Sequence, residues 1–121
     1  MHSAFAITLE QALKLGPPPA GNLAVPVFEH GTLNAELYSP RGHDPQQPHT
    51  RDEIYVVARG KGLFFNGGER VLVQPGSFLF VAAGQEHRFE QFSDDFAVWV
   101  FFYGPEGGEQ SATLEAGQTC R

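Results

Sequence analysis

The sequence predicts an all-β protein with one short helix near its N-terminus, and three observations support this fold class. Fourteen Gly and nine Pro residues among 121 provide frequent turns. Eleven Phe residues and repeated Val runs favour strands over helices. Short apolar segments follow one another with no helical pattern between them, which is typical of a sandwich or closed barrel. A chain of this length is large enough for one domain with a sizeable core.

The elements can be assigned in chain order from turn residues and apolar periodicity. Residues 8–15, TLEQALKL, predict a short helix because Thr8 and Gln11 can form a capping box, and Gly16 with three prolines ends it. Strands are predicted at residues 25–29, 32–39, 54–58, 62–66, 70–74, 77–81, 88–92 and 96–103. Residues 66–68, Asn-Gly-Gly, predict a hairpin turn, and the last three strands are expected to continue an antiparallel meander.

Composition and charge exclude several function classes. A net charge of −6, with the Lys and Arg residues scattered along the chain, argues against nucleic-acid binding. The longest apolar run is too short to cross a membrane and the N-terminus lacks a signal pattern, so we expect no membrane contact and a cytoplasmic location. The single cysteine, Cys120, excludes an intrachain disulfide. Low apolar content in residues 105–121 predicts a flexible C-terminal tail.

The predicted strand at residues 96–103, FAVWVFFY, is apolar on both faces. A strand with one face in water should alternate between apolar and polar residues, so the outer face of this strand must be covered. The N-terminal helix has only about two turns and is short for this task. We therefore expect a homodimer in which a second copy of the chain covers the strand.

Polar residues gather in residues 42–60, just before an apolar strand. In an extended segment every second side chain points the same way, so Gln47, His49 and Glu53 are expected to share one face. A strand returning antiparallel would bring His87 beside them. Two imidazoles and one carboxylate form a triad that suits Fe(II) and related divalent metals and leaves coordination positions open. Gln47 is then either a weaker fourth ligand or a hydrogen-bonding partner of a metal-bound water.

These stretches resemble the two conserved motifs of the cupin superfamily, in particular those of small single-domain cupins of the cupin-2 type. In the first motif, His49 lies four residues before Glu53, and six residues separate Glu53 from Gly60. Gln47 replaces the first histidine of that motif. The second motif is matched by Pro75, Gly76, Gly84 and His87, with Gln91 in place of an asparagine.

The resemblance implies a double-stranded β-helix, or jelly-roll barrel, in a single domain over residues 1–104. Residues 1–24 would form the N-terminal helix and arm, and residues 25–104 the barrel. The family's metal ligands carry over as His49, Glu53 and His87, with Gln47 at the fourth position. The metal implied is a divalent transition metal, with Fe, Mn, Ni and Zn all possible, and the resemblance also implies a dimer.

Further side chains share the parity of the ligands and are predicted to line a substrate pocket: Arg51, Tyr55, Val57, Phe89 and Gln91. Arg51 and Tyr55 are the catalytic candidates. Arg51 could pair with an acidic group of the substrate, or it could be an exposed arginine at the barrel rim. The other four residues could equally be ordinary core.

Two functions are compatible with such a site. The first is a metal-dependent enzyme, dioxygenase-like or isomerase-like, acting on a small organic substrate that is anionic or enolisable. The second is a non-catalytic metal-containing module that binds or senses a small molecule. An enzyme should carry a titratable acid or base in its cavity beyond the ligands, and the sequence offers only Arg51 and Tyr55 for that role.

Overall fold

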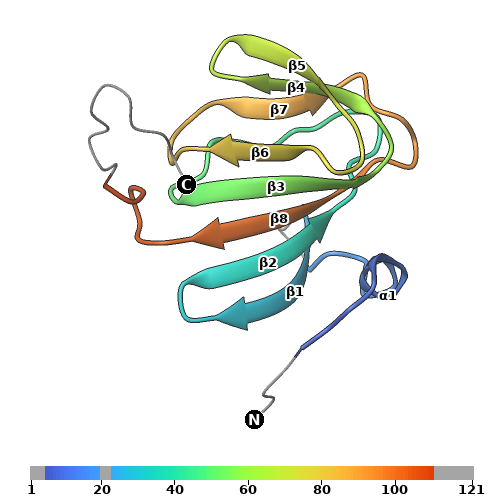
Figure 1. The fold of residues 1–121 in the computed structure, drawn as a ribbon, viewed down its shortest axis with the longest axis horizontal. Coiled ribbons are helices and arrows are strands. Elements are labelled where there is room, and N and C mark those ends of the chain that lie inside the picture. Colours follow the sequence, from blue (N-terminus) through green and yellow to red (C-terminus); the bar gives the residue numbers. More distant parts are fainter. Residues whose placement is uncertain (1–4, 20–22, 111–121) are drawn as a thin grey trace.

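The computed structural model describes residues 5–19 and 23–110 and contains two antiparallel sheets (Figure 1). A five-stranded sheet has the order β1-β2-β8-β3-β6, and a three-stranded sheet has the order β5-β4-β7. The elements are α1 (Leu9–Leu13), β1 (Val25–His30), β2 (Leu33–Tyr38), β3 (Asp52–Arg59), β4 (Gly62–Asn66), β5 (Glu69–Val73), β6 (Phe78–Val81), β7 (His87–Glu90) and β8 (Ala97–Tyr103). The predicted all-β fold with one short N-terminal helix is confirmed.

Consecutive strands are not always neighbours in these sheets. β8 lies between β2 and β3 and pairs antiparallel with both, whereas β7 pairs with β4 in the other sheet. The predicted meander of the last three strands is therefore wrong, because β6, β7 and β8 alternate between the two sheets. This alternation is the strand order of a jelly roll, and it places β7 across the interior from β3 instead of beside it.

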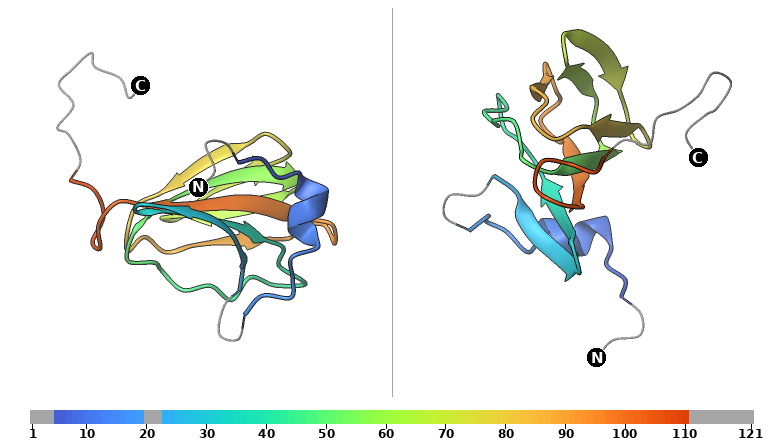
Figure 2. Two further views of the ribbon diagram at one scale, coloured as in Figure 1. Left: turned by 90° about the horizontal axis from the view of Figure 1, so that it is seen from below. Right: turned by 90° about the vertical axis from the view of Figure 1, so that its left-hand side faces the viewer.

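The helix α1 is shorter than the predicted segment. The capping box forms as expected, since the Thr8 backbone N donates to Gln11 Oε1 at 2.9 Å and the Gln11 backbone N donates to Thr8 Oγ1 at 3.1 Å. Ala12 is fully buried, and α1 lies beside β1 and β2, far from the three-stranded sheet (Figure 2). No helix in the described part of the chain is long and apolar enough to span a membrane.

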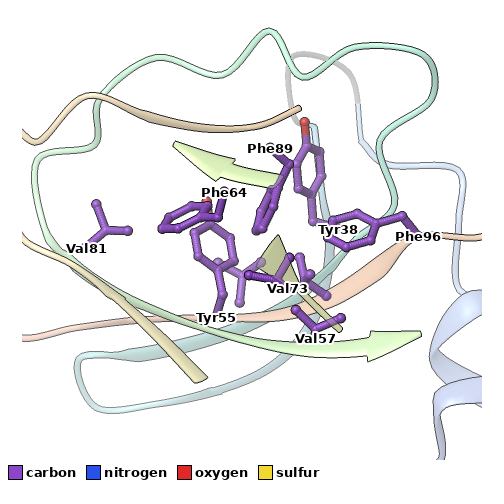
Figure 3. Close-up of a cluster of buried hydrophobic side chains, with 10 residues drawn as sticks. Tyr38, Tyr55, Val57, Phe64, Val73, Val81, Phe89 and Phe96 are labelled. Carbon is purple, nitrogen blue, oxygen red and sulfur yellow. The ribbon is translucent and has the colours of Figure 1, made fainter. Parts of the chain in front are cut away.

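Aromatic rings from both sheets meet in the core (Figure 3). Tyr55 on β3 packs against Phe89 on β7 with ring centroids 4.9 Å apart, and Phe89 packs against Phe64 on β4 at the same distance. Each such buried side chain stabilises the fold by roughly 1.5–3 kcal/mol. The core therefore joins the two sheets through the interior, close to where β3 and β7 present their polar residues.

Gly60 allows the chain to turn from β3 into β4 and so to change sheets. Its φ is +82°, and a Cβ at this position would lie 2.5 Å from Ser93 Oγ and 2.7 Å from Phe96 Cα. A side chain is excluded on both counts, by the left-handed backbone and by the close approach. The glycine of the first sequence motif is thus required by the local geometry.

The first residues of the predicted tail are held against the barrel. The Gly107 backbone N donates to Thr50 O at 2.6 Å, and the Glu109 backbone N donates to Asp52 Oδ2 at 2.8 Å. Asp52 is buried and also accepts the Ala83 backbone N at 3.0 Å. Residues 105–110 therefore belong to the folded unit, and the expectation of a flexible tail is wrong for them. Residues 111–121 lie outside the described residues.

Candidate metal centre

His49, Glu53 and His87 meet inside the barrel, and their ligand atoms all lie within 4.8 Å of one another. Glu53 is on β3, His49 is in the loop that precedes this strand, and His87 begins β7 in the opposite sheet. The structure thus brings together the three residues that the sequence predicts as ligands. His87 reaches them across the interior, not from an adjacent strand as expected.

The carboxylate of Glu53 tests whether this cluster suits a cation. Glu53 is 1% exposed, and neither of its oxygens has a hydrogen-bond partner among the described residues. The His87 Nε2 atom lies 3.2 Å from Glu53 Oε1 and pairs with it only when the imidazole is protonated. A buried carboxylate without compensation costs several kcal/mol, which a bound cation would offset. Two imidazoles and a carboxylate are donors that suit a divalent transition metal.

The backbone orients His87 for ligation. Nδ1 lies 2.8 Å from the Gln85 carbonyl oxygen and donates to it, so Nε2 of the neutral ring directs its lone pair at the cluster. Burial alone would lower the pKa of His87. The contact that the protonated ring makes with Glu53, the hydrogen bond to the Gln85 carbonyl and the negative charge of Glu53 outweigh burial and raise this pKa above its ordinary value.

His49 is half-buried, and its ring packs edge-on against Phe102 with centroids 4.9 Å apart. Burial lowers the pKa of His49, and the smaller opposing effect of Glu53 does not reverse this. The neutral imidazole, which is the form that binds a metal, is therefore favoured at this position.

The amide that faces the cluster belongs to Gln46 and not to Gln47. Gln46 Oε1 lies 3.3 Å from His49 Nε2 and accepts the Tyr55 hydroxyl at 2.9 Å. Gln47 borders the same cavity but is exposed. The prediction of Gln47 assumed an extended segment, whereas residues 45–48 form an irregular loop in which alternation does not hold. Gln46 and Gln47 are adjacent and lie between two prolines, so only the local backbone geometry of the loop determines which of the two faces the cluster.

Tyr55 is the catalytic candidate that reaches the site. Its side chain is fully buried, borders the cavity, and places its hydroxyl 3.1 Å from His87 Nε2. Burial, together with the nearby charge of Glu53, raises the pKa of Tyr55 well above its ordinary value. The hydroxyl therefore keeps its proton and acts as a hydrogen-bond donor.

Arg51 points away from the cavity. Its guanidinium group donates from Nε to the Gly104 carbonyl at 3.0 Å and from Nη1 to Asn34 Oδ1 at 2.9 Å, and it also donates to the Thr32 carbonyl. These bonds tie the β1–β2 turn to the end of β8. The prediction that Arg51 enters the pocket is wrong, and its alternative, an arginine at the barrel rim, matches the structure.

The other predicted pocket residues do not border this cavity. Val57 and Phe89 are 2% and 1% exposed and form part of the apolar core. Gln91 is exposed and follows β7 with a positive φ of 48°, so its side chain lies on the surface. For Val57 and Phe89 the core alternative holds, and Gln91 fits neither expectation.

A cavity of about 320 Å³ opens onto the group formed by His49, Glu53 and His87, which is called the metal-type cluster below. Its size is at the small end of the range for pockets that bind small molecules. The described residues that line it include no lysine and no arginine, and they are Leu23, Ala24, Glu36, Tyr38, Gln46, Gln47, Pro48, His49, Glu53, Tyr55, Val100 and Phe102.

Sequence reasoning missed Glu36, an acidic side chain of this cavity. Glu36 lies on β2 and shares the inward parity of Tyr38. Burial raises its pKa above the ordinary value, and the negative charges of Glu53 and Glu29 add to this effect. Glu36 lies two residues before Tyr38 in the segment LNAELY, so the two side chains share one face of the strand. This spacing could identify Glu36 as a cavity residue only once the face of β2 that points into the barrel is known.

The fold and the cluster define a class of small jelly-roll protein with a histidine and carboxylate site in its interior. The sequence matches the family described as "Cupin domain" over residues 35–103, more than half of the chain. The protein belongs to the cupin family, which confirms the resemblance drawn from the two motifs.

Individual similar proteins fit this assignment. An uncharacterised protein of Streptomyces coelicolor is 41% identical over 63 residues, which cover 52% of this chain and 60% of that protein. A cupin-2 domain containing protein from Shewanella frigidimarina has a TM-score of 0.63 at 15% identity, covering 81% of this chain and 94% of that one. DMSP lyase DddQ from Ruegeria pomeroyi has a TM-score of 0.53 at 24% identity, covering 60% and 39% of the two chains. At such identities, the solved structures show a shared fold and nothing further.

Proposed function

We propose that the protein is a metal-dependent enzyme that removes a proton next to the carbonyl of a small, neutral, enolisable compound, in the manner of an isomerase. The observation that carries this proposal is Glu36, a carboxylate that faces the same cavity as the metal-type cluster without belonging to it. An enzyme needs an acid or base beyond the metal ligands, whereas a binding module does not. Glu36 meets that need.

Glu36 is suited to the role of general base. Its pKa is raised by burial and, to a smaller extent, by the charges of Glu53 and Glu29. A general base works best when its pKa lies near the pH of the reaction, so this shift favours Glu36 as a base near neutral pH. The carbon–hydrogen bond breaks, the proton passes to Glu36, and the electron pair moves to the carbonyl oxygen. For an α-hydroxy carbonyl compound such as hydroxyacetone, the proton of the α-hydroxyl group passes to that oxygen. Return of the proton from Glu36 to the former carbonyl carbon, as the α-oxygen becomes the new carbonyl, completes an isomerisation. A bound divalent metal supplies a Lewis acid that polarises an oxygen atom.

The charge of the cavity favours a neutral substrate. Arg51, expected to hold an anionic group, is bonded elsewhere, and no lysine or arginine of the described chain lines the cavity. Glu36 and Glu53 would repel a second anionic group. The apolar side chains of Val100 and Phe102 border the same space and can contact a short hydrocarbon part.

Proton exchange in D₂O tests this proposal directly. The protein is loaded separately with Fe(II), Mn(II), Ni(II) and Zn(II) and mixed with hydroxyacetone, and loss of the α-proton signal is followed by NMR. We expect at least one metal form to exchange faster than the same free metal. Glu36→Gln should slow this exchange by about 10²-fold or more while its metal content stays that of the wild type. Pyruvate serves as the matched anionic probe and should exchange more slowly.

Two results would count against the proposal. If every metal form binds hydroxyacetone and none exchanges its proton, the non-catalytic binding or sensing module replaces the enzyme. If exchange is unchanged in Glu36→Gln, Glu36 is not the base.

A further inference from the structure

A buried carboxylate holds the Gln46 side chain in one orientation. Asp44 is 8% exposed, and its Oδ2 accepts Gln46 Nε2 at 2.6 Å while its Oδ1 accepts the Gln46 backbone N at 3.3 Å. An ionised carboxylate only accepts hydrogen bonds, so the NH₂ group of the amide must be the end that faces Asp44. The oxygen Oε1 is thereby turned toward the metal-type cluster.

Asp44 is itself fixed to both sheets. Its Oδ2 accepts the Phe89 backbone N on β7 at 2.8 Å, and its Oδ1 accepts the Tyr38 hydroxyl on β2 at 2.5 Å. The donors of these hydrogen bonds all belong to buried or half-buried residues. The irregular loop that carries Gln46 is therefore anchored next to the cluster without being part of a strand.

The position of Gln46 Oε1 matches the spacing of donor atoms around one metal. Donors that share a metal at bonds of about 2.1 Å and right angles lie about 3.0 Å apart. Gln46 Oε1 is 3.3 Å from His49 Nε2, which is close to the 3.2 Å between His87 Nε2 and Glu53 Oε1. An amide oxygen has two lone pairs, and the Tyr55 hydroxyl uses only one of them.

We propose that Gln46 Oε1 is a fourth metal ligand and that Asp44 is the positioning residue that presents it. Gln47, which occupies the position of the first histidine in the sequence motif, is then not a ligand. This inference rests on the metal site of the proposed function and adds a residue that the motif does not identify.

Paired leucine variants test the ligand. Gln46→Leu removes the amide oxygen, and Gln47→Leu is the matched control on the neighbouring residue. Affinity for Zn(II) is measured by competition with a chelator, and the absorption spectrum of the Co(II) form reports its coordination. We expect Gln46→Leu to bind Zn(II) about 10- to 100-fold more weakly and to alter the Co(II) spectrum, with Gln47→Leu unchanged in both.

The role of Asp44 is tested by replacing one of its two acceptor oxygens. Asp44→Asn puts an NH₂ group in place of one oxygen, so the carboxylate no longer determines which end of the Gln46 amide faces residue 44. We expect a weaker affinity and an altered Co(II) spectrum. Thermal melts of the metal-free variants show that each one folds.

The outcomes separate this inference from the proposed function. Wild-type affinity and an unchanged Co(II) spectrum in Gln46→Leu would overturn the ligand role, and a loss confined to Gln47→Leu would assign the role to that residue. If a folded Asp44→Asn behaves as the wild type, Asp44 is not a positioning residue. Failure of the wild-type protein to bind any of the metals would instead reject the metal site itself.

Discussion

The two faces of the five-stranded sheet are built by the same strands but differ in chemistry. On β3, Glu53 and Tyr55 point into the barrel, next to the cavity, whereas Ile54 points outward. On β6, Phe78 and Phe80 point outward and are 66% and 47% exposed. A sheet with one wet face normally places polar groups outside and apolar groups inside. Both faces here depart from that rule: a buried carboxylate without a hydrogen-bond partner among the described residues lies inside, and exposed aromatic rings lie outside.

The outer face extends across the sheet from β2 to β6. Strand pairing places Trp99 beside Leu37 and Val56, and Phe101 beside Ala35 and Ile54. Phe78 and Phe80 continue the face through their pairs with Val56 and Ile54. The helix α1 lies at the β1–β2 end, so it leaves the β3–β6 end open.

The largest expected effect is the loss of metal binding at the inner face. We predict that His49→Ala, Glu53→Ala and His87→Ala each abolish stoichiometric metal binding, because each removes one of three strong ligands. Metal content per chain after dialysis is the measurement. The control is the thermal melt of the metal-free Glu53→Ala protein at a pH above the raised pKa of His87, where Glu53 has no protonated partner. Under that condition the melting temperature should not fall below that of the metal-free wild type. Full metal occupancy in any of the three variants would show that the cluster is not the site.

The second-largest expected effect is a loss of metal affinity at the inner face on acidification, over a pH range that depends on the pKa of His87. Metal binding needs neutral imidazoles, and His87 has a pKa raised above its ordinary value of about 6.5. Its proton therefore competes with the metal already above pH 6.5, and affinity should fall about tenfold per pH unit below that raised pKa. An affinity that stays constant from pH 8 to pH 6 would contradict this.

The same shift has the opposite sign in the metal-free protein. A raised folded-state pKa means that protonated His87 stabilises the fold fully below about pH 6.5, and that this contribution is lost as pH rises through the raised value. Melting temperatures measured with and without a chelator between pH 5.5 and 8 should therefore change in opposite directions with pH.

The outer face should determine the oligomeric state. We expect a second copy of the chain to cover it, because Phe78 and Phe80 are exposed there beside Ile54 and Val56, and a two-fold pairing would bury these rings. Light scattering after size exclusion should give a dimer for the wild type and a monomer for Phe78→Asp. Metal content should be equal in both, which would separate the two faces. A wild-type monomer at micromolar concentration would mean that this face has no such partner.

The smallest expected effect concerns an exception on the outer face. Asp52 shares the outward parity of Ile54 but is polar, buried and satisfied by backbone groups of two loops. Deleting the chain from Glu106 removes the bond from Glu109 to Asp52, so we expect a loss of about 1–2 kcal/mol of stability. A flexible tail, as expected from the sequence for residues 105–121, would give no change. Thermal melting decides between these, and Asp52→Asn should give a similar small loss.

The sequence specified most strands of the fold and the three residues that its two motifs carry. The bounds of most strands follow from their apolar runs and turn glycines, and His49, Glu53 and His87 follow from two motifs. The homodimer stays a prediction.

The errors fall where side-chain parity stops applying. Gln46 sits in a loop between prolines, so a rule for strands selected its neighbour Gln47. Arg51 has the right parity but lies at the end of the sheet, where carbonyl groups of two turns capture its guanidinium group. Glu36 was missed because its meaning depends on which strand lies across the cavity. The errors on Arg51 and Glu36 depend on contacts between segments far apart in the chain, and the error on Gln46 depends on the local geometry of its loop. Strand parity describes neither.

The two carboxylates of the cavity also affect how fast a cation arrives. Glu36 and Glu53 face a space with no lysine or arginine in its described lining, within a chain of net charge −6. A concave site of one sign focuses the field and raises the encounter rate of oppositely charged ions by about 10-fold or more at low ionic strength. Metal uptake should therefore slow as salt is added, with the dissociation rate nearly constant. In Glu36→Gln this salt dependence should be weaker, although the ligands are all retained.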